Sequence, residues 1–330
     1  MEILHQEQSN ESVPFLSHST DIPERTKYRT LFCPFSPFWS QEDDPYYIHF
    51  RYGFCPVYPT LLGISLNVIC GLYWIFKLGP LFWEKKPWVI YVFALLYGLD
   101  LWSFFISLWA NPGVLPYDYF SNPRKKYTLN EICAGSASTE EQYKYAKSQK
   151  RLGRMIFSVR TGTYILRADH FCPWIGNYVG AYNRHQFILA TLYISLACSF
   201  AFGTSIYAYN NYHVFYWPRL LPYLFITGAF SFLCGFQFFT QLYSITKNVT
   251  YIEMIKQSKP IYDRGCFNNW EEVCGKREYL LCWLLPIQLP LPIDPFTYDL
   301  APENPLANEK ENTSQKPEEN TVDMDVLDGV

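Results

Sequence analysis

Four long apolar stretches constrain the fold of this chain more than any other feature of its sequence. They cover residues 57–78, 88–110, 186–209 and 220–243. Each is close to the roughly 20 residues that a helix needs to cross the hydrocarbon core of a bilayer. The third and fourth contain no charged residue, which is rare for a core helix of a soluble protein. The sequence therefore predicts an all-α membrane protein with four transmembrane helices.

Asp100 lies in the middle of the second stretch. A carboxylate is costly in lipid, so this side chain is expected to face a partner or a water-filled cavity. A buried acid that hydrogen-bonds between helices is favoured here over a catalytic acid, and both roles stay open at this stage.

The distribution of Lys and Arg predicts the orientation in the membrane. The loop 112–184 holds eleven of them, the segment after Tyr243 eight and the first 56 residues four, whereas the connections at 79–87 and 210–219 hold two and one. The positive-inside tendency then places both termini and the long middle loop in the cytosol. A net charge of only −3 gives no argument for a nucleic-acid partner.

The ten cysteines are scattered and form no CxxC pair. Neither a disulfide framework nor a zinc ribbon is indicated. Thiols on the predicted cytosolic side are expected to stay reduced, and so available for chemistry.

One short motif gathers chemically useful side chains just before the third apolar stretch. Residues 169–180 read DHFCPWIGNYVG, so a carboxylate, an imidazole and a thiol lie within four residues. A thiol becomes a nucleophile when a neighbouring His takes its proton, and an acid can orient that His. Pro173 and Trp174 follow Cys172 and predict a rigid turn. The alternative is a chance polar turn before a membrane helix.

Three further signals flank the motif at the ends of the apolar stretches. NPG follows the second stretch at 111–113, NVTYIE follows the fourth at 248–253, and YDRGCFNNWEEVCG covers 262–275. With these in order, residues 57–286 resemble the Asp-His-His-Cys (DHHC) protein S-acyltransferases, the palmitoyltransferases. The motif positions that agree are Asp169, His170, Cys172, Pro173, Trp174, Asn177, Val179, Gly180 and Asn183. NPG resembles the DPG signature of that family.

The other two signals resemble the supporting motifs of the same family. Thr250 and Glu253 stand at its TTxE motif, and Asn269 stands at the key asparagine of its C-terminal motif. Tyr251 replaces the second Thr of TTxE, and the resemblance implies that this region hydrogen-bonds Asp169. Either the Tyr251 hydroxyl or Thr250 is expected to make that bond. Alternatively, Thr250 and Glu253 simply start a helix. Asn269 is expected to have a structural role and to bond backbone atoms near the active loop.

The chain departs from the family at its zinc ligands. The family's cysteine-rich loop normally binds two zinc ions, but here only Cys133 precedes the motif within that loop, and no His does. The expected ligand positions are held by Phe157, Ser158, Thr161, Tyr164, Phe171 and Tyr178. Zinc needs about four nitrogen or sulfur ligands, so no metal site and no cofactor is predicted. The aromatic residues are expected to supply packing in place of the metal.

The resemblance implies a two-step acyl transfer. His170 takes the proton of Cys172, Asp169 orients His170, and the thiolate attacks palmitoyl-CoA to give an acyl-enzyme. A cysteine of a cytosolic or membrane-associated protein then takes the chain. The acyl chain is expected to lie between the transmembrane spans, with Trp174 near the reactive end of that acyl chain. Arg151, Arg154 and Arg167 are expected either to meet the CoA phosphates or to face solvent and lipid.

A catalytically inactive membrane scaffold or chaperone is the competing interpretation, and a transporter or channel has little support. The expected partners are palmitoyl-CoA, protein substrates and the bilayer. Residence in the endoplasmic reticulum or Golgi is implied by the resemblance only. The predicted segments are a cytosolic, interfacial or partly disordered N-terminal segment (1–56), spans one and two (57–110), a cytosolic catalytic loop (111–185), spans three and four (186–243), a cytosolic C-terminal domain (244–301) and a disordered acidic tail (302–330).

Overall fold

The computed structural model describes the bundle and most of the segments that flank it. The described residues are 28–30, 39–41, 44–50, 53–119, 140–148, 154–158, 162–212, 217–256 and 262–292, with side chains from residue 59 onward. Predictions about residues 1–27, Cys133, Arg151 and the acidic tail 302–330 lie outside the described residues.

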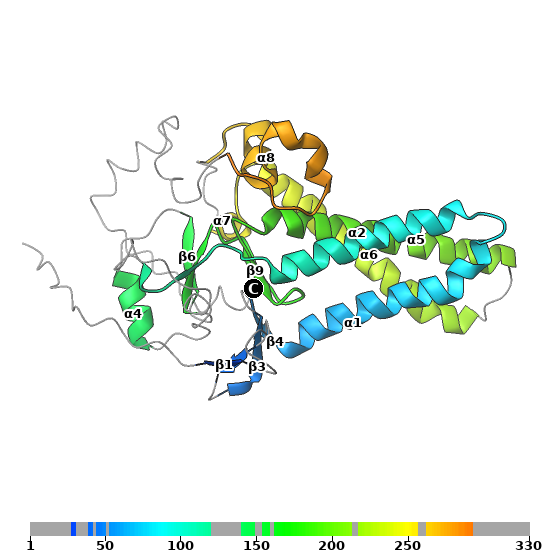
Figure 1. Ribbon diagram of the computed structural model, residues 1–330, viewed down its shortest axis with the longest axis horizontal. Helices are drawn as coiled ribbons and strands as arrows, with labels where there is room; N and C mark the ends of the chain where they lie inside the picture. Colours follow the sequence, from blue (N-terminus) through cyan, green and yellow to red (C-terminus); the bar gives the residue numbers. More distant parts are fainter. Residues whose placement is uncertain are drawn as a thin grey trace, which may run out of the picture.

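Four long helices run side by side along the long axis of the molecule (Figure 1). They are α1 (Val57–Tyr73), α2 (Trp88–Trp109), α5 (Arg184–Tyr212) and α6 (Trp217–Thr246), and α1 continues through the short turns η1 (Trp74–Leu78) and η2 (Gly79–Phe82). The stretches Pro59–Phe82, Trp88–Trp109, Arg184–Tyr212 and Pro218–Thr246 are long and apolar enough to cross a membrane. The predicted architecture of four membrane-spanning helices is thereby confirmed.

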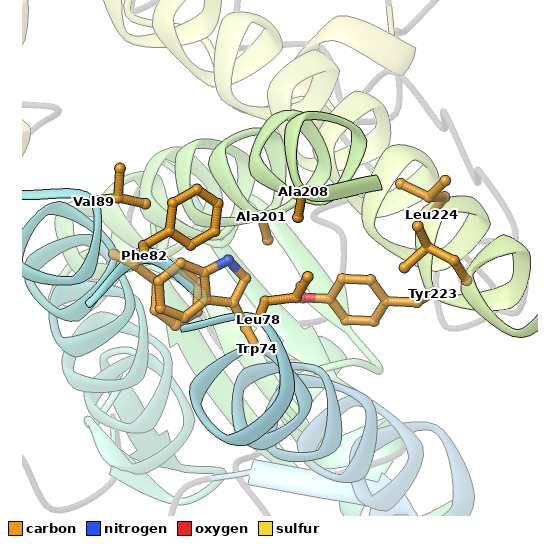
Figure 2. Close-up of a cluster of buried hydrophobic side chains, with 10 residues drawn as sticks. Trp74, Leu78, Phe82, Val89, Ala201, Ala208, Tyr223 and Leu224 are labelled. Atoms are coloured by element: carbon orange, nitrogen blue, oxygen red, sulfur yellow. The ribbon is translucent and has the colours of Figure 1, made fainter. Parts of the chain in front are cut away.

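Aromatic packing closes the end of the bundle at which α1 leads into α2. Trp74 is 1% exposed and stacks on Phe93 with the ring centroids 3.8 Å apart. Its indole nitrogen donates a hydrogen bond of 2.9 Å to the hydroxyl of Thr204 on α5. Small residues of α5, Ala201 and Ala208, leave room for these rings (Figure 2). The connection between the first two spans is therefore fixed to the third.

Asp100 bonds to a neighbouring helix. The amide nitrogen of Asn67 on α1 donates to both carboxylate oxygens of Asp100 on α2, at 3.1 Å each. Asp100 is 3% exposed. The interpretation of Asp100 as a buried acid that joins helices is confirmed.

In the part of the chain that the structure describes, three small antiparallel sheets add to the predicted all-α architecture. The first has the strand order β1-β2-β3-β4, the second β5-β7-β6 and the third β8-β9. The strands are β1 (Tyr28–Thr30), β2 (Trp39–Gln41), β3 (Asp44–Phe50), β4 (Gly53–Pro56), β5 (Val114–Pro116), β6 (Met155–Ser158), β7 (Thr163–Leu166), β8 (His170–Cys172) and β9 (Asn177–Val179). The first sheet lies in the N-terminal segment, where the expected interfacial or partly disordered leader included no strand.

Short helices cover the same end of the bundle as the sheets (Figure 1). They are α4 (Glu140–Ser148), α7 (Tyr251–Ile255), α8 (Cys266–Cys274) and η4 (Arg277–Leu284). Val273, Cys274 and Trp283 from the C-terminal segment pack against Ile188 of α5 and Ile245 of α6. This packing places the C-terminal segment beside the start of the third span and the end of the fourth.

Candidate active site

The DHFC motif forms a β-hairpin, and the hairpin explains the spacing of its reactive residues. Strands β8 and β9 pair His170 with Val179, Phe171 with Tyr178 and Cys172 with Asn177. Alternate residues of a strand share a face, so His170 and Cys172 lie on one side and Phe171 on the other. Gly176, with a φ of 58°, closes the turn in a conformation that suits glycine. The predicted turn after Cys172 is therefore part of a hairpin.

The side-chain amide of Asn177 attaches this hairpin to the second span. The side-chain nitrogen of Asn177 donates to the carbonyl oxygens of Ser107, Leu108 and Ala110, at 3.2, 3.3 and 2.9 Å. These carbonyls at the end of α2 lack a partner within their own helix. Gly180 passes so close to Pro112 that a Cβ atom would lie 2.3 Å from its carbonyl oxygen. The motif residues beyond Cys172 thus serve to position the hairpin.

Asp169 is completely buried and surrounded by donors. Its Oδ2 accepts hydrogen bonds from Nδ1 of His170 at 2.9 Å and from Nε2 of Gln241 at 2.7 Å. Its Oδ1 accepts one from the backbone N–H of Tyr251 at 2.9 Å and forms an ion pair with Arg184 at 3.0 Å. Because an ionised carboxylate only accepts, Nδ1 of His170 carries the hydrogen in this contact. The carboxylate therefore fixes the tautomer and the orientation of the imidazole.

The expectation that the hydroxyl of Tyr251 or Thr250 bonds Asp169 is wrong. The contact comes from the backbone of Tyr251, the first residue of α7. Thr250 instead caps that helix, since its hydroxyl accepts from the N–H of Glu253 and the carboxylate of Glu253 accepts from the N–H of Thr250. This capping box leaves the first helical N–H free to reach the carboxylate. Thr250 and Glu253 act on Asp169 through the start of α7.

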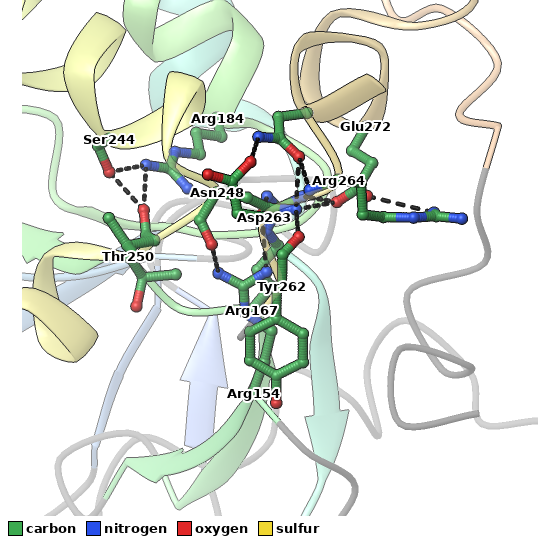
Figure 3. A network of polar contacts seen from close by, with 12 residues as sticks. Arg154, Arg167, Arg184, Ser244, Asn248, Thr250, Tyr262, Asp263, Arg264 and Glu272 are labelled. Atoms are coloured by element: carbon green, nitrogen blue, oxygen red, sulfur yellow. Dashed lines mark hydrogen bonds and ion pairs between the residues drawn. The ribbon is translucent and has the colours of Figure 1, made fainter. Parts of the chain in front are cut away.

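Two residues around Asp169 were missed in the sequence. Arg184 opens α5 and is 1% exposed, and Gln241 lies near the end of α6 and is also 1% exposed. The guanidinium of Arg184 donates to Gln241 at 3.1 Å. It also donates to the hydroxyl of Ser244 at 2.5 Å (Figure 3). The only signal in the sequence is Gln241 itself, a polar residue in the last turns of the otherwise apolar fourth span.

At neutral pH the site holds an ionised Asp169 and a protonated His170. Burial opposes ionisation of Asp169, but the charge of Arg184 and the hydrogen bonds from His170 and Gln241 outweigh it and hold the pKa of Asp169 well below its usual value. Burial also disfavours the charged ring of His170. Hydrogen bonds to Asp169 and Cys172, together with the charges of those two groups, raise the pKa of His170 to about 9. The ring is therefore protonated at neutral pH.

Cys172 and His170 open on one large cavity between the long helices. The cavity has a volume of about 630 Å³ and is lined mainly by apolar side chains of α1, α2, α5 and α6. Cys172 is 7% exposed, and Trp174 lines the same cavity with its ring edge-on to Phe230, centroids 6.1 Å apart. The hydroxyl of Thr60 donates to the carbonyl of Pro173 at 2.7 Å and holds the turn against α1. The geometry combines an oriented base, a thiol and an apolar channel.

Arg154 and Arg167 do not face a phosphate site. Their side chains are 1% and 2% exposed. Arg154 bonds Glu253 through two contacts of 2.8 Å, and Arg167 pairs with Glu272 at 3.6 Å. Both arginines donate to the side-chain oxygen of Asn248 (Figure 3). The expectation that they meet CoA phosphates, solvent or lipid is therefore wrong for these two residues. They hold the loop to the segment after α6.

Asn269 belongs to the same polar network and has a structural role, as expected. Its side-chain nitrogen donates to the carbonyl of Thr246 at 2.8 Å and to Asp263 at 2.7 Å, and its oxygen accepts from the N–H of Arg264 at 2.9 Å. Asn269 is completely buried. These bonds join the end of α6 to α8 and so support the position of α7.

Comparison with known proteins shows which family this chain resembles. Residues 137–258 match the DHHC palmitoyltransferase family profile. This part of the chain carries a DHHC domain. Among its relatives are palmitoyltransferase AKR1 of Yarrowia lipolytica (25% identical over 182 residues, 54% of this chain), palmitoyltransferase ZDHHC2 of Danio rerio (23% over 252, 62%) and palmitoyltransferase ZDHHC20 of Homo sapiens (26% over 243, 62%). The chain spans 26%, 64% and 65% of the length of these three relatives, less than two thirds of each.

The residues at the expected zinc positions do not suit the metal. Phe157 packs on Tyr164 and Phe171 on Tyr178, with centroids 5.1 and 5.2 Å apart. The hydroxyl of Tyr164 donates to the carbonyl of Ala146, and that of Tyr178 to the hydroxyl of Ser158. Within the part of the chain that the structure describes, no group of three or more His, Cys, Asp and Glu is placed to hold a metal ion. The absence of zinc stays a prediction.

Proposed function

We propose that this protein is a protein S-acyltransferase. It takes a long acyl chain from palmitoyl-CoA, carries the chain as a thioester on Cys172, and passes it to cysteines of proteins on the cytosolic side of a membrane. The observation that carries the proposal is that the thiol and the imidazole oriented by Asp169 line one apolar cavity between four membrane-spanning helices. That cavity suits a chain too apolar for water.

The first half of the proposed reaction forms the acyl-enzyme. The thiolate of Cys172 attacks the thioester carbonyl carbon of the acyl-CoA, and the bond from that carbon to the CoA sulfur breaks. The imidazolium of His170 gives its proton to the departing CoA thiolate. Asp169 keeps the ring aligned and stabilises its charge throughout.

The second half regenerates the enzyme. His170 takes the proton of an acceptor cysteine, whose sulfur attacks the acyl carbon. The bond to Cys172 breaks, and Cys172 leaves as the thiolate beside the protonated ring. Because each half exchanges one thioester for another, the reaction needs no oxidant, reductant or water.

The proposal includes the surroundings of the site. Both termini and the segments 111–185 and 244–301 lie in the cytosol, the orientation favoured by the distribution of Lys and Arg. Trp174 lies beside the reactive end of the chain, and endomembranes such as the endoplasmic reticulum or Golgi hold the protein. The site is proposed to work without zinc, because aromatic side chains stand where the family has metal ligands.

A labelling experiment tests the proposal. Detergent-purified protein is incubated with fluorescent palmitoyl-CoA, and we expect label on the protein that neutral hydroxylamine removes, together with release of free CoA. Cys172→Ala should abolish both signals, while Cys266→Ala, which removes an exposed cysteine of α8, should keep them. Equal labelling of the wild type and Cys172→Ala would contradict the enzyme proposal and favour an inactive scaffold.

A further inference from the structure

The wall of the cavity contains one polar section that the proposed reaction does not use. Asn67, Tyr97 and Asp100 line the cavity together, and we call them the polar waist. The amide nitrogen of Asn67 donates to both oxygens of Asp100, and the hydroxyl of Tyr97 donates to the backbone oxygen of Asn67 at 3.4 Å. Most of the other cavity wall is apolar, so the waist is a local exception.

The polar waist lies well below the reactive thiol. Asp100 is four residues along α2 from Phe104, which packs in one cluster with Cys172, so it lies about 6 Å deeper. Asn67 is seven residues along α1 from Thr60, which bonds the residue after Cys172, so it lies about 10 Å deeper. An extended chain advances about 1.2 Å per bond. The waist therefore meets a sixteen-carbon chain near its middle.

One acceptor in the waist lacks a donor. Within the described part of the chain, Oδ1 of Asn67 is buried and has no hydrogen-bond partner. The amide nitrogen of Asn67, and not this oxygen, faces Asp100. By contrast, the hydroxyl of Thr227, also in the cavity wall, donates to the carbonyl of Tyr223 in its own helix at 2.8 Å. A buried acceptor left without a donor is unfavourable, so a ligand that supplies one gains affinity.

The chemistry of the waist defines the group it accepts. Asn67 Oδ1 and the carboxylate oxygens of Asp100 call for a hydrogen-bond donor, and a charged donor is excluded by the apolar wall around it. A hydroxyl is the smallest neutral donor that an acyl chain can carry. We propose that the cavity binds an acyl chain with a hydroxyl group near its middle, and that Asn67 and Asp100 hold that hydroxyl. This inference rests on the proposed function, since it names the class of acyl chain.

Binding to a protein that cannot turn over tests the inference. Cys172→Ala protein is titrated with five competitors of a fluorescent acyl-CoA: hexadecanoyl-CoA, the three chains hydroxylated at carbon 6, 8 or 10, and the chain hydroxylated at its terminal carbon. We expect the best mid-chain member to bind about three- to tenfold more tightly than the terminal isomer, the worth of one added hydrogen bond. The terminal isomer controls for polarity, because it has the same atoms.

Variants then locate the preference. Asn67→Leu in the same background should remove the advantage of the mid-chain hydroxyl, and Thr227→Val should keep it. The inference would be overturned if every mid-chain isomer bound as tightly as the terminal isomer or more weakly. This comparison uses the Cys172→Ala protein alone, so it does not depend on the folding of a further variant. If none of the acyl-CoAs binds, the proposed function itself fails, which is a different result.

Discussion

Asp169 receives its partners from four separate elements. His170 lies on β8, Arg184 on α5, Gln241 on α6 and the N–H of Tyr251 on α7. Each carboxylate oxygen has two partners, so the group cannot rotate without losing one. The orientation of the His170 ring therefore depends on the packing of the third and fourth spans.

Gln241 offers a direct test of this dependence. Gln241→Leu removes the bond of 2.7 Å to the oxygen that also holds His170. A hydrogen bond to a charged group contributes about 1.5–3 kcal/mol, so the rate of acyl-enzyme formation should fall by about tenfold or more. The measurement is single-turnover labelling with saturating palmitoyl-CoA.

The control is Gln237→Leu, one helical turn earlier on α6, where the side chain lines the cavity. It tests for a general effect of removing an amide from this part of α6. An equal loss of rate in both variants would contradict a specific role for Gln241. A positioning role further requires that Gln241→Glu, which keeps the shape, changes the pH profile of the rate.

His170 should make stability depend on pH in a defined window. Its pKa is raised from 6.5 to about 9 in the folded protein, so its contribution to the free energy of unfolding is fully present below pH 6.5 and is lost as pH rises through about 9. The unfolding temperature in detergent should therefore fall between pH 6.5 and 9. In His170→Gln this fall should be smaller, and an identical slope in both proteins would show that the ring is not charged in the fold.

At the scale of elements, apolar length predicted the four spans because it is a local property. Their ends were less predictable, since α5 begins with Arg184, His185 and Gln186. His185 and Gln186 bond the carbonyls of Trp283 and Ile287, about 100 residues later in the chain. Partners so distant in sequence leave no local signal.

The hairpin and the partners of Arg154 and Arg167 were also not predictable from local sequence. Residues 170–179 form two three-residue strands, too short for alternation to be recognised beside Pro173. Arg154 and Arg167 looked like a basic surface because Glu253 and Glu272, which neutralise them, follow about 100 residues later. The motif residues themselves were predictable, because the resemblance placed Asp169, His170 and Cys172 directly.

Aromatic packing around the hairpin should be essential for stability. Phe171 is 4% exposed and packs on Tyr178 in the cluster with Val114 and Ile165. Phe171→Ala should lower the free energy of unfolding by about 3–5 kcal/mol, the usual effect of emptying an aromatic site in a core. Thermal unfolding in detergent measures this effect.

Phe267→Ala serves as the control, because Phe267 is 67% exposed.

If the aromatic residues replace the metal, elemental analysis of the pure protein should find zinc near zero, and a chelator should leave the unfolding temperature unchanged. One or more zinc ions per chain, or unfolding by the chelator, would contradict that interpretation.

For the whole molecule, the cavity joins the site to the membrane-spanning bundle. Its wall includes residues from all four long helices, and aromatic packing around Trp74 closes the bundle beyond it. The helical bundle therefore sets the length of acyl chain that fits, whereas the hairpin sets the reactivity of the Cys172 thiol.

Filling the cavity should separate the two properties. Ala197 on α5 is 4% exposed and lines the cavity, so Ala197→Phe should block a sixteen-carbon chain while an eight-carbon acyl-CoA still labels the protein. Leu196→Phe is the matched control, because Leu196 is the adjacent residue and is 42% exposed. Labelling by both chain lengths in Ala197→Phe would show that the chain lies elsewhere.

Mapping of the acyl group tests the central claim most directly. Wild-type protein is mixed with palmitoyl-CoA, quenched in acid within a single turnover, digested and analysed by mass spectrometry. We expect the thioester on Cys172, at a stoichiometry that falls strongly in His170→Gln. An acyl group found only on other cysteines, or on Cys172 to the same extent without His170, would contradict a thiol activated by its neighbouring imidazole.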